Sequence, residues 1–240
     1  MRRLGTGLAL CFYAVVGLAA AGVWDTKPLT EWTDKETQAV LTDSPWAGKG
    51  ALTNARSGGG FSPVPDWKIT VAWRTGLPIR QALVRQQIGP GGKIMAEQQA
   101  MLSAEDDAYV ISVEGLPGMY APMMQNLAAQ TALERDGKPP LAPVKGVAQL
   151  FDKDGKPLDK LPTPPARSGG EPAAGRGGRG FAGAGAPSDG TTATLFFGFP
   201  KNDPITAADK DVEFSMTVGS YHLKHKFHLK DMMVKGAPAL

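Results

Sequence analysis

The sequence predicts an α+β fold that is mainly antiparallel β-sheet, with a few short helices. Three observations lead to this prediction. Several segments alternate apolar and polar residues with a period of two, as half-buried strands do. Asp-Gly and Gly-Ser pairs separate apolar segments at hairpin spacing. Helical signals are confined to short stretches, so a sandwich-like body with minor helices is the expected architecture.

The first residues have the form of an export signal. Met1-Arg2-Arg3 precedes an apolar run from Leu4 to Ala20, and Ala19-Ala20-Ala21 stands just ahead of Gly22. A basic start, an apolar middle and a small-residue exit are typical of a secretory signal peptide, so residues 1–21 are expected to be cleaved near Ala21. The alternative is an uncleaved membrane anchor, because the run approaches the ~20 residues that span a bilayer. Either way the rest is expected to be periplasmic or extracellular.

Cysteine content and charge exclude several classes of protein. Cys11 is the only cysteine and lies within the predicted signal peptide, so the mature chain is expected to hold no disulfide and no thiolate site. The chain has 26 basic and 23 acidic residues, and removal of Arg2 and Arg3 leaves 24 against 23, or +1 with His neutral. Because a dedicated nucleic-acid binder usually shows a basic surplus, no nucleic-acid partner is expected.

Short helices are expected near residues 34–41, 79–88 and 119–130. Thr33 and Glu36 have the spacing of a capping box, which opens the first helix. Proline is tolerated in the first turn, so Pro78 can begin the second. In the third, apolar residues four apart indicate one amphipathic face. A polar stretch from Lys93 to Leu102 is a further helical candidate.

Strands are expected around residues 69–73 and 109–113, where apolar residues alternate with polar ones. The near-copies 133–139 and 151–157 each contain an Asp-Gly turn, which predicts a small meander with residues 144–151 as its central strand. Residues 195–199 are apolar on both faces and end at Pro200, as in a central strand.

The C-terminal hairpin is predicted down to its register. Residues 212–218 alternate with a period of two, and Gly219-Ser220 provides a two-residue turn. This turn places Val218 opposite Tyr221, and the register then puts the apolar residues of both strands on one face. The other face pairs Glu213 with Lys226 and Asp211 with His228.

Residues 162–190 consist mainly of Gly, Ala and Pro with scattered Arg and Ser. Such a segment cannot bury enough apolar surface to offset the entropy of ordering, so it is expected to be a disordered insert. The remaining residues, 22–161 and 191–240, are then expected to form a single β-rich domain.

The three histidines, His222, His225 and His228, do not predict a metal site. On a strand the first and last share a face but lie too far apart for direct co-ligation, and His225 points to the opposite face. No metal and no cofactor are therefore expected. The shared face is a basic row that also contains Lys224, Lys226 and Lys230. Asp211 and Glu213 are expected to pair with part of this row across the hairpin. Lys224 and Lys230 lack an obvious partner, which makes them candidate binding residues.

Two further groups of residues carry candidate roles. Trp24, Trp32 and Trp46 form a Trp-rich opening, and aromatic residues are enriched in contact surfaces, so Trp32 and Trp46 are candidate binding residues. The alternative is that they pack the N-terminal arm onto the domain. Adjacent acids at Glu105-Asp106-Asp107 are candidates for hydrolytic chemistry, against an ordinary role as solvated or capping groups.

A resemblance extends these observations. The opening Lys27-Pro28-Leu29-Thr30-Glu31-Trp32-Thr33, the Ser44-Pro45-Trp46 motif and the C-terminal Lys226-Phe227-His228-Leu229-Lys230-Asp231-Met232 resemble a family of uncharacterised exported bacterial proteins of acidobacterial type. The resemblance implies export and a shared fold, and it carries no activity. The sequence thus favours a non-catalytic envelope or surface protein that binds a protein or glycan of the cell envelope, with membrane contact only if the leader is retained. The alternative is a periplasmic or secreted hydrolase that uses acidic residues.

Overall fold

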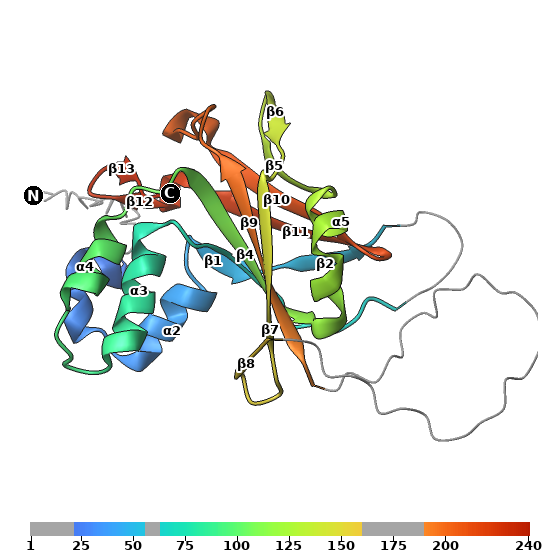
Figure 1. Cartoon of the computed structure of the whole chain (residues 1–240). Helices are drawn as coiled ribbons and strands as arrows, with labels where there is room; N and C mark the ends of the chain where they lie inside the picture. The colour runs from blue at the N-terminus through green and yellow to red at the C-terminus, as the bar shows by residue number, and fades with distance from the viewer. Residues whose placement is uncertain (1–21, 56–62, 160–189) are drawn as a thin grey trace, which may run out of the picture.

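Two antiparallel sheets form the centre of the molecule, and a group of helices lies at one end of them (Figure 1). The computed structural model describes residues 22–55, 63–159 and 190–240. The predicted fold class is confirmed, because the described chain is α+β and mainly antiparallel sheet.

The predicted signal peptide with Cys11, and the predicted insert except Gly190, lie outside the described residues. Export and disorder in these two segments therefore stay predictions. None of the helices in the described ranges is long and apolar enough to cross a membrane.

Short helices cover one end of the sheets. They are α1 (Val23–Thr26), η1 (Leu29–Glu31), α2 (Asp34–Thr42), α3 (Leu77–Ile88) and α4 (Ala96–Ser103). Helix α2 begins where predicted, because the Thr33 hydroxyl oxygen accepts a hydrogen bond from the Glu36 N–H (3.2 Å) and the Glu36 carboxylate accepts one from the Thr33 N–H (2.9 Å). Helix α3 carries Pro78 in its first turn, also as predicted.

The larger sheet has six strands in the order β1-β3-β4-β9-β7-β8. Its strands are β1 (Ala47–Lys49), β3 (Thr70–Trp73), β4 (Ala108–Pro117), β7 (Lys145–Phe151), β8 (Pro157–Leu158) and β9 (Thr192–Pro200). The prediction of a central strand over residues 195–199 is confirmed, since β9 pairs with both β4 and β7. A bulge in β4 requires glycine at position 115, because φ there is +84° and a Cβ would lie 2.2 Å from the Lys68 carbonyl oxygen.

The second sheet has five strands in the order β2-β11-β10-β5-β6. Its strands are β2 (Ala51–Asn54), β5 (Thr131–Arg135), β6 (Lys138–Leu141), β10 (Asp211–Val218) and β11 (Tyr221–His228). The predicted hairpin register is confirmed from the pair Val218 and Tyr221 to the pair Asp211 and His228. Its turn uses Gly219 at a φ of +59°.

A bent strand joins the two sheets. Strands β1 and β2 are separated only by Gly50, and each belongs to a different sheet. A Cβ at Gly50 would lie 2.5 Å from the Leu223 Cδ1 atom, so the chain turns where its backbone lies close to an inward-pointing side chain.

The core lies between the sheets and is rich in aromatic rings. The Phe197 ring of the six-stranded sheet is 5.8 Å from the Phe214 ring of the five-stranded sheet. Trp73 on β3 and Phe227 on β11 meet edge to face at 5.2 Å. These four side chains are fully buried, so the two sheets pack face to face as a sandwich does.

Two predicted elements are wrong in detail. Residues 119–130 do not form one amphipathic helix: a 3₁₀ helix, η2 (Gly118–Met123), is followed by the short α5 (Met124–Ala128). Pro122 lies inside η2 and lacks the N–H that a continuous α-helix needs.

The predicted meander does not form, although both of its Asp-Gly turns do. Gly137 and Gly155 adopt φ values of +68° and +76° in the two hairpins. The β5-β6 hairpin belongs to the five-stranded sheet and the β7-β8 hairpin to the six-stranded sheet. The chain crosses between the sheets from Leu141 to Lys145, where Pro143 cannot donate to a strand ladder.

The C-terminal segment returns to the helical end of the molecule (Figure 1). After η3 (Ala207–Asp209) and the β10-β11 hairpin it forms η4 (Leu229–Asp231), β12 (Met233–Val234) and β13 (Ala237–Pro238). The Trp46 Nε1–H donates to the Ala239 carbonyl oxygen at 2.6 Å, which fixes the last residues to the core.

Candidate functional site

The candidate tryptophans are core residues. Trp32 is 1% exposed and Trp46 is 0% exposed. The Trp32 Nε1–H donates to the Lys27 carbonyl oxygen at 3.2 Å, and the Trp46 ring meets Trp24 edge to face at 4.9 Å. Their burial leaves no ring surface for a partner, so their placement agrees with the alternative in which tryptophans pack the N-terminal arm onto the domain. Neither is retained as a binding residue.

The outward side of the five-stranded sheet is instead lined by polar side chains, which we call the polar face. It comprises Asp211, Glu213, Ser215 and Thr217 from β10, His222, Lys224, Lys226 and His228 from β11, and Glu134 from β5. The inward residues of the same strands are the apolar ones, so period-two alternation alone places the polar set outside. Glu134 was not singled out from the sequence, because β5 was not predicted as the neighbour of β10.

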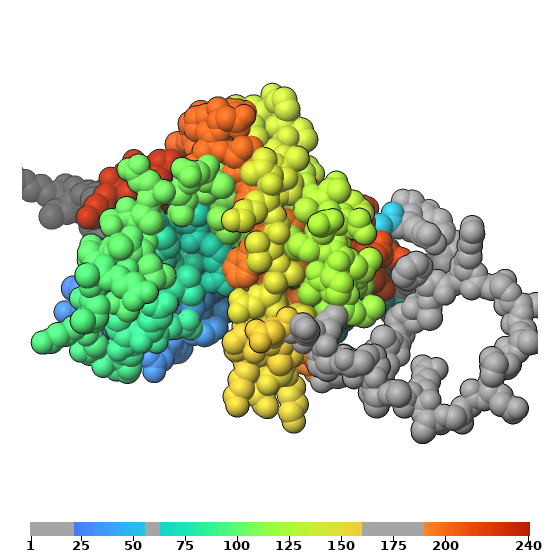
Figure 2. Space-filling model, in the orientation of Figure 1, coloured from blue at the N-terminus to red at the C-terminus, as the bar shows by residue number. Residues whose placement is uncertain are grey.

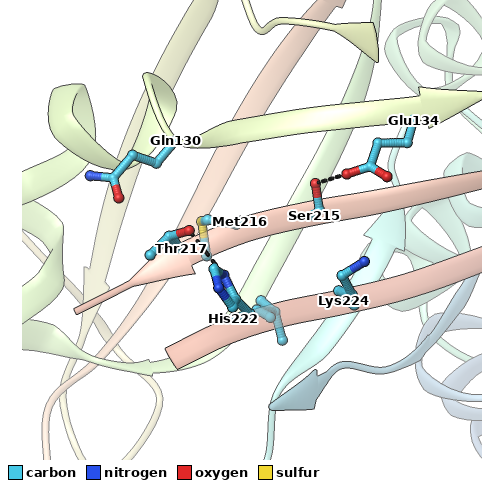
Figure 3. Close-up of a pocket in the computed structure, with 8 residues that line it drawn as sticks. Gln130, Glu134, Ser215, Met216, Thr217, His222 and Lys224 are labelled. Atoms are coloured by element: carbon cyan, nitrogen blue, oxygen red, sulfur yellow. Dashed lines mark hydrogen bonds between the residues drawn. The ribbon is translucent and has the colours of Figure 1, made fainter. Parts of the chain in front are cut away.

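Hydroxyl groups connect the strands at one end of the polar face (Figure 3). The Thr217 Oγ1 and His222 Nδ1 atoms lie 3.2 Å apart, and the Ser215 hydroxyl donates to the Glu134 carboxylate at 2.8 Å. These groups and Gln130 border a hollow of about 240 Å³. A second hollow of about 370 Å³ shares Glu134 and extends toward Asp211 and Lys226. Glu134 thus borders both hollows.

Two carboxylates face each other at the centre of the polar face. Glu134 and Glu213 are register partners on β5 and β10, which opposes like charges across a strand pair. Lys224 relieves this repulsion, because its ammonium lies 2.6 Å from the Glu213 carboxylate. The hydrogen bond to Glu213 raises the pKa of Lys224 above its usual value. Lys224 thus has a partner that sequence reasoning missed, since the contact is diagonal rather than directly across the hairpin.

A second group of charges lies at the other end of the hairpin. The His228 Nδ1 atom is 2.7 Å from the Asp211 carboxylate, and the Lys226 ammonium is 4.0 Å from it. The hydrogen bond from His228 holds the pKa of Asp211 below its usual value. Lys230 is exposed on η4, and no hydrogen bond or ion pair connects it to another described residue.

His225 lies on the inward side of β11, as the strand pattern predicts. Its ring contacts Phe227 edge to face at 4.6 Å, and its Nδ1 atom is 3.0 Å from the Lys49 carbonyl oxygen. Glycine at position 48 makes room for it, since a Cβ there would lie 2.7 Å from the His225 ring. Burial lowers the pKa of His225. Within the described ranges, no three His, Cys, Asp or Glu residues converge as metal ligands.

The acidic run at residues 105–107 lies next to helices α3 and α4. Asp106 lies 3.8 Å from Arg80, and Arg80 also donates to the Ala104 carbonyl oxygen at 2.5 Å. These contacts tie the end of α4 to α3. Glu105 and Asp107 are exposed, as solvated acids are. The run therefore lies away from the polar face and brings no second carboxylate toward a common point.

The polar face combines a hydroxyl–imidazole contact with ion pairs and open hollows. Thr217 and His222 have the spacing of a nucleophile and a base, but no described carboxylate hydrogen-bonds to the other side of the His222 ring to orient it. Glu213 is paired with Lys224 and Asp211 with His228, and the hollows lie on an open sheet surface. Such a face offers donors and acceptors of both signs to a polar partner.

A scan against protein-family models and searches of curated proteins and of solved structures found nothing that matches this chain.

Proposed function

We propose that this chain is a non-catalytic binding protein of the cell envelope or cell surface. It is exported by its N-terminal leader, and it contacts its partner through the polar face. The partner is a protein or glycan of the envelope that presents hydroxyl, amide and charged groups. The leader residues 1–21 support the location, since they have the form of a signal peptide.

One observation carries the proposal. The polar face is an open surface of charged and hydroxyl groups on a sheet whose opposite side is largely buried. Phe214, Leu223 and Phe227 are 0% exposed on that inward side, so the strands beneath the face are held rigidly. A rigid surface with many donors and acceptors suits recognition of a polar partner, because little order is lost on binding.

Ser215→Arg tests the polar face directly. A long cationic side chain at this position fills the first hollow, which Ser215 lines, and points away from the inward core. The matched control is Gln38→Arg, which adds the same residue at an exposed position of α2. The mature protein is immobilised and exposed to a solubilised envelope fraction, and captured proteins and glycans are identified by mass spectrometry and then titrated.

We expect wild type and Gln38→Arg to bind the same component, and Ser215→Arg to bind it at least tenfold more weakly. Equal capture by Ser215→Arg would show that the polar face is not the contact surface. N-terminal sequencing of the protein recovered from the envelope tests its export, with Gly22 as the expected first residue. Recovery of an intact Met1 end from the cytosol would contradict the proposed location.

A hydrolase is the second candidate, and the opposition of Glu134 and Glu213 favours it. Paired carboxylates on adjacent strands are the groups that glycoside hydrolysis uses. The test incubates envelope glycans with wild type, Glu134→Gln and Glu213→Gln and measures the release of reducing ends. Release by wild type that is lost in both variants would replace the binding proposal with catalysis. No release above a heat-denatured control supports binding.

A further inference from the structure

The six-stranded sheet ends in an edge that is only partly paired. Strand β8 is the register partner of β7 only at Leu150 and Phe151. From Lys145 to Gln149, no strand in the described part of the chain pairs with this side of β7. Val144 and Val147 are 72% and 49% exposed. In Figure 2 the yellow segment that contains β7 forms part of the visible surface.

The direction of the backbone groups on β7 follows from the β7-β8 hairpin. The Asp152 N–H donates to the Lys156 carbonyl oxygen at 2.9 Å across this hairpin. In an antiparallel strand, the N–H and C=O of one residue point to the same side, and the side alternates from residue to residue. Gly146 and Ala148 therefore direct two N–H and two C=O groups to the open edge. None of these four groups bonds to another described residue.

The edge strand of the five-stranded sheet, β6, is poorly suited to pair with an added strand. Strand β6 contains Pro139 and Pro140, which cannot donate hydrogen bonds to an added strand. By contrast, β7 has no proline and a single charge over residues 144–149. An unpaired edge with free donors and acceptors is a template for another extended chain.

The side chains on the outward face of β7 define the chemistry of that chain. Lys145, Val147 and Gln149 share this face, and Val147 is the register partner of Phe196 on β9. Lys145 is exposed and forms no ion pair within the described ranges. A β-branched apolar residue suits the position opposite Val147, and a carboxylate suits the position opposite Lys145.

We propose that the open edge of β7 binds an extended peptide that adds as an antiparallel strand next to Lys145–Gln149. The peptide carries a β-branched residue opposite Val147 and an acidic residue opposite Lys145. Its backbone pairs with Gly146 and Ala148 and continues the line of β8 along the sheet edge. Only about five residues pair, so the complex is weak and transient. This site is on the other sheet and does not depend on the polar face.

The test titrates a fluorescent peptide, acetyl-Gly-Thr-Thr-Val-Thr-Glu-Gly-amide, into the full-length protein and follows anisotropy. Antiparallel pairing sets its Val opposite Val147 and its Glu opposite Lys145. The control peptide is N-methylated at the second Thr and at the Thr that follows Val, which removes the two amides that face β7. We expect the control peptide to bind at least tenfold more weakly.

Protein variants locate the site. Ala148→Pro removes an N–H that faces the open edge and leaves the bonds to β9, so we expect at least tenfold weaker binding with an unchanged far-UV spectrum. Ala148→Ser keeps the N–H and is expected to bind as wild type does. Lys145→Glu is expected to weaken binding about two- to fivefold and to regain it with a peptide whose Glu is replaced by Lys.

Three outcomes would overturn the proposal. The first is equal binding of the two peptides. The second is binding that Ala148→Pro and Lys145→Glu leave unchanged. The third is absence of binding to wild type. Sedimentation of wild type and Ala148→Pro then tests whether a second copy occupies the edge, since only such pairing gives a dimer that the proline abolishes.

Discussion

Trp46→Phe tests whether the N-terminal tryptophans are structural. The substitution keeps an aromatic ring in a fully buried site but removes the Nε1–H that donates to the Ala239 carbonyl oxygen. Loss of this hydrogen bond costs about 1 kcal/mol of unfolding free energy, and the smaller ring weakens the edge-to-face contact with Trp24 by roughly another 1 kcal/mol. With a contribution from imperfect packing, we expect a total loss of about 2–3 kcal/mol.

Urea unfolding followed by circular dichroism measures this loss, since fluorescence would change with the substitution itself. In a chain of this size the loss corresponds to a fall in Tm of about 5–10 °C. Carboxypeptidase digestion gives a second readout, because release of Ala239 exposes the C-terminal residues. We expect faster trimming of the variant than of wild type.

Trp67→Phe is the matched control. Trp67 is half-buried between Tyr120 and Tyr221, at ring distances of 5.6 and 5.8 Å, and its N–H has no acceptor among the described residues. A phenyl ring preserves these contacts, so we expect a loss below about 1 kcal/mol. A Trp46→Phe variant that unfolds within about 0.5 kcal/mol of wild type, or equal destabilisation of the two variants, would contradict a structural role for the Trp46 N–H.

Three further predictions concern local structure. Thr33→Ala removes the N-cap of α2 and should cost about 1 kcal/mol in urea unfolding. Gly115→Ala should lower the free energy of unfolding by about 3 kcal/mol or more, because a positive φ and a contact with a backbone carbonyl oxygen combine there. Gly155→Ala, which has a positive φ but open space around the new Cβ, should lower it by about 1 kcal/mol. Similar losses in the two variants would show that the carbonyl contact at position 115 is easily relieved. Burial lowers the pKa of His225, so protonation favours the unfolded chain and stability should fall as the pH drops below about 6.5; between pH 7.5 and 5.5, His225→Gln should lose less stability than wild type, and equal losses would exclude this cause.

The C-terminal hairpin could be predicted because residues close together in the sequence determine both its turn and its register. A two-residue turn at Gly219-Ser220 fixes the register, and a shift by one residue would move Phe214 and Phe227 to solvent. The same register puts His225 on the inward face and His228 on the outward face. Strand β9 was also predictable, since an apolar run on both faces requires neighbours on either side.

Other parts depended on long-range contacts that local patterns do not contain. Both Asp-Gly hairpins form, but their assignment to different sheets depends on how the chain crosses after Leu141. Burial of Trp32 and Trp46 depends on the return of the C-terminal segment and on the helical end of the molecule. A Trp-rich opening looks the same in sequence whether its rings face a partner or the core.

The candidate site was predicted in part. Alternation placed the basic row of β11 on the outward face, but the partner of Lys224 depended on side-chain reach along the diagonal to Glu213. Glu134 entered the site only through pairing of β5 with β10, two strands that are distant in sequence. Lys230 stays a candidate contact at the end of the row, exposed on η4.

The covalent connection of the two sheets at Gly50 affects how the protein unfolds. Because β1 and β2 are covalently continuous and pair with β3 and β11 respectively, neither sheet can separate from the other while both pairings persist. The two halves of the core should therefore melt in a single cooperative transition. Amide protons of Val71 on β3 and Leu223 on β11 should exchange with the same opening free energy in native-state hydrogen exchange.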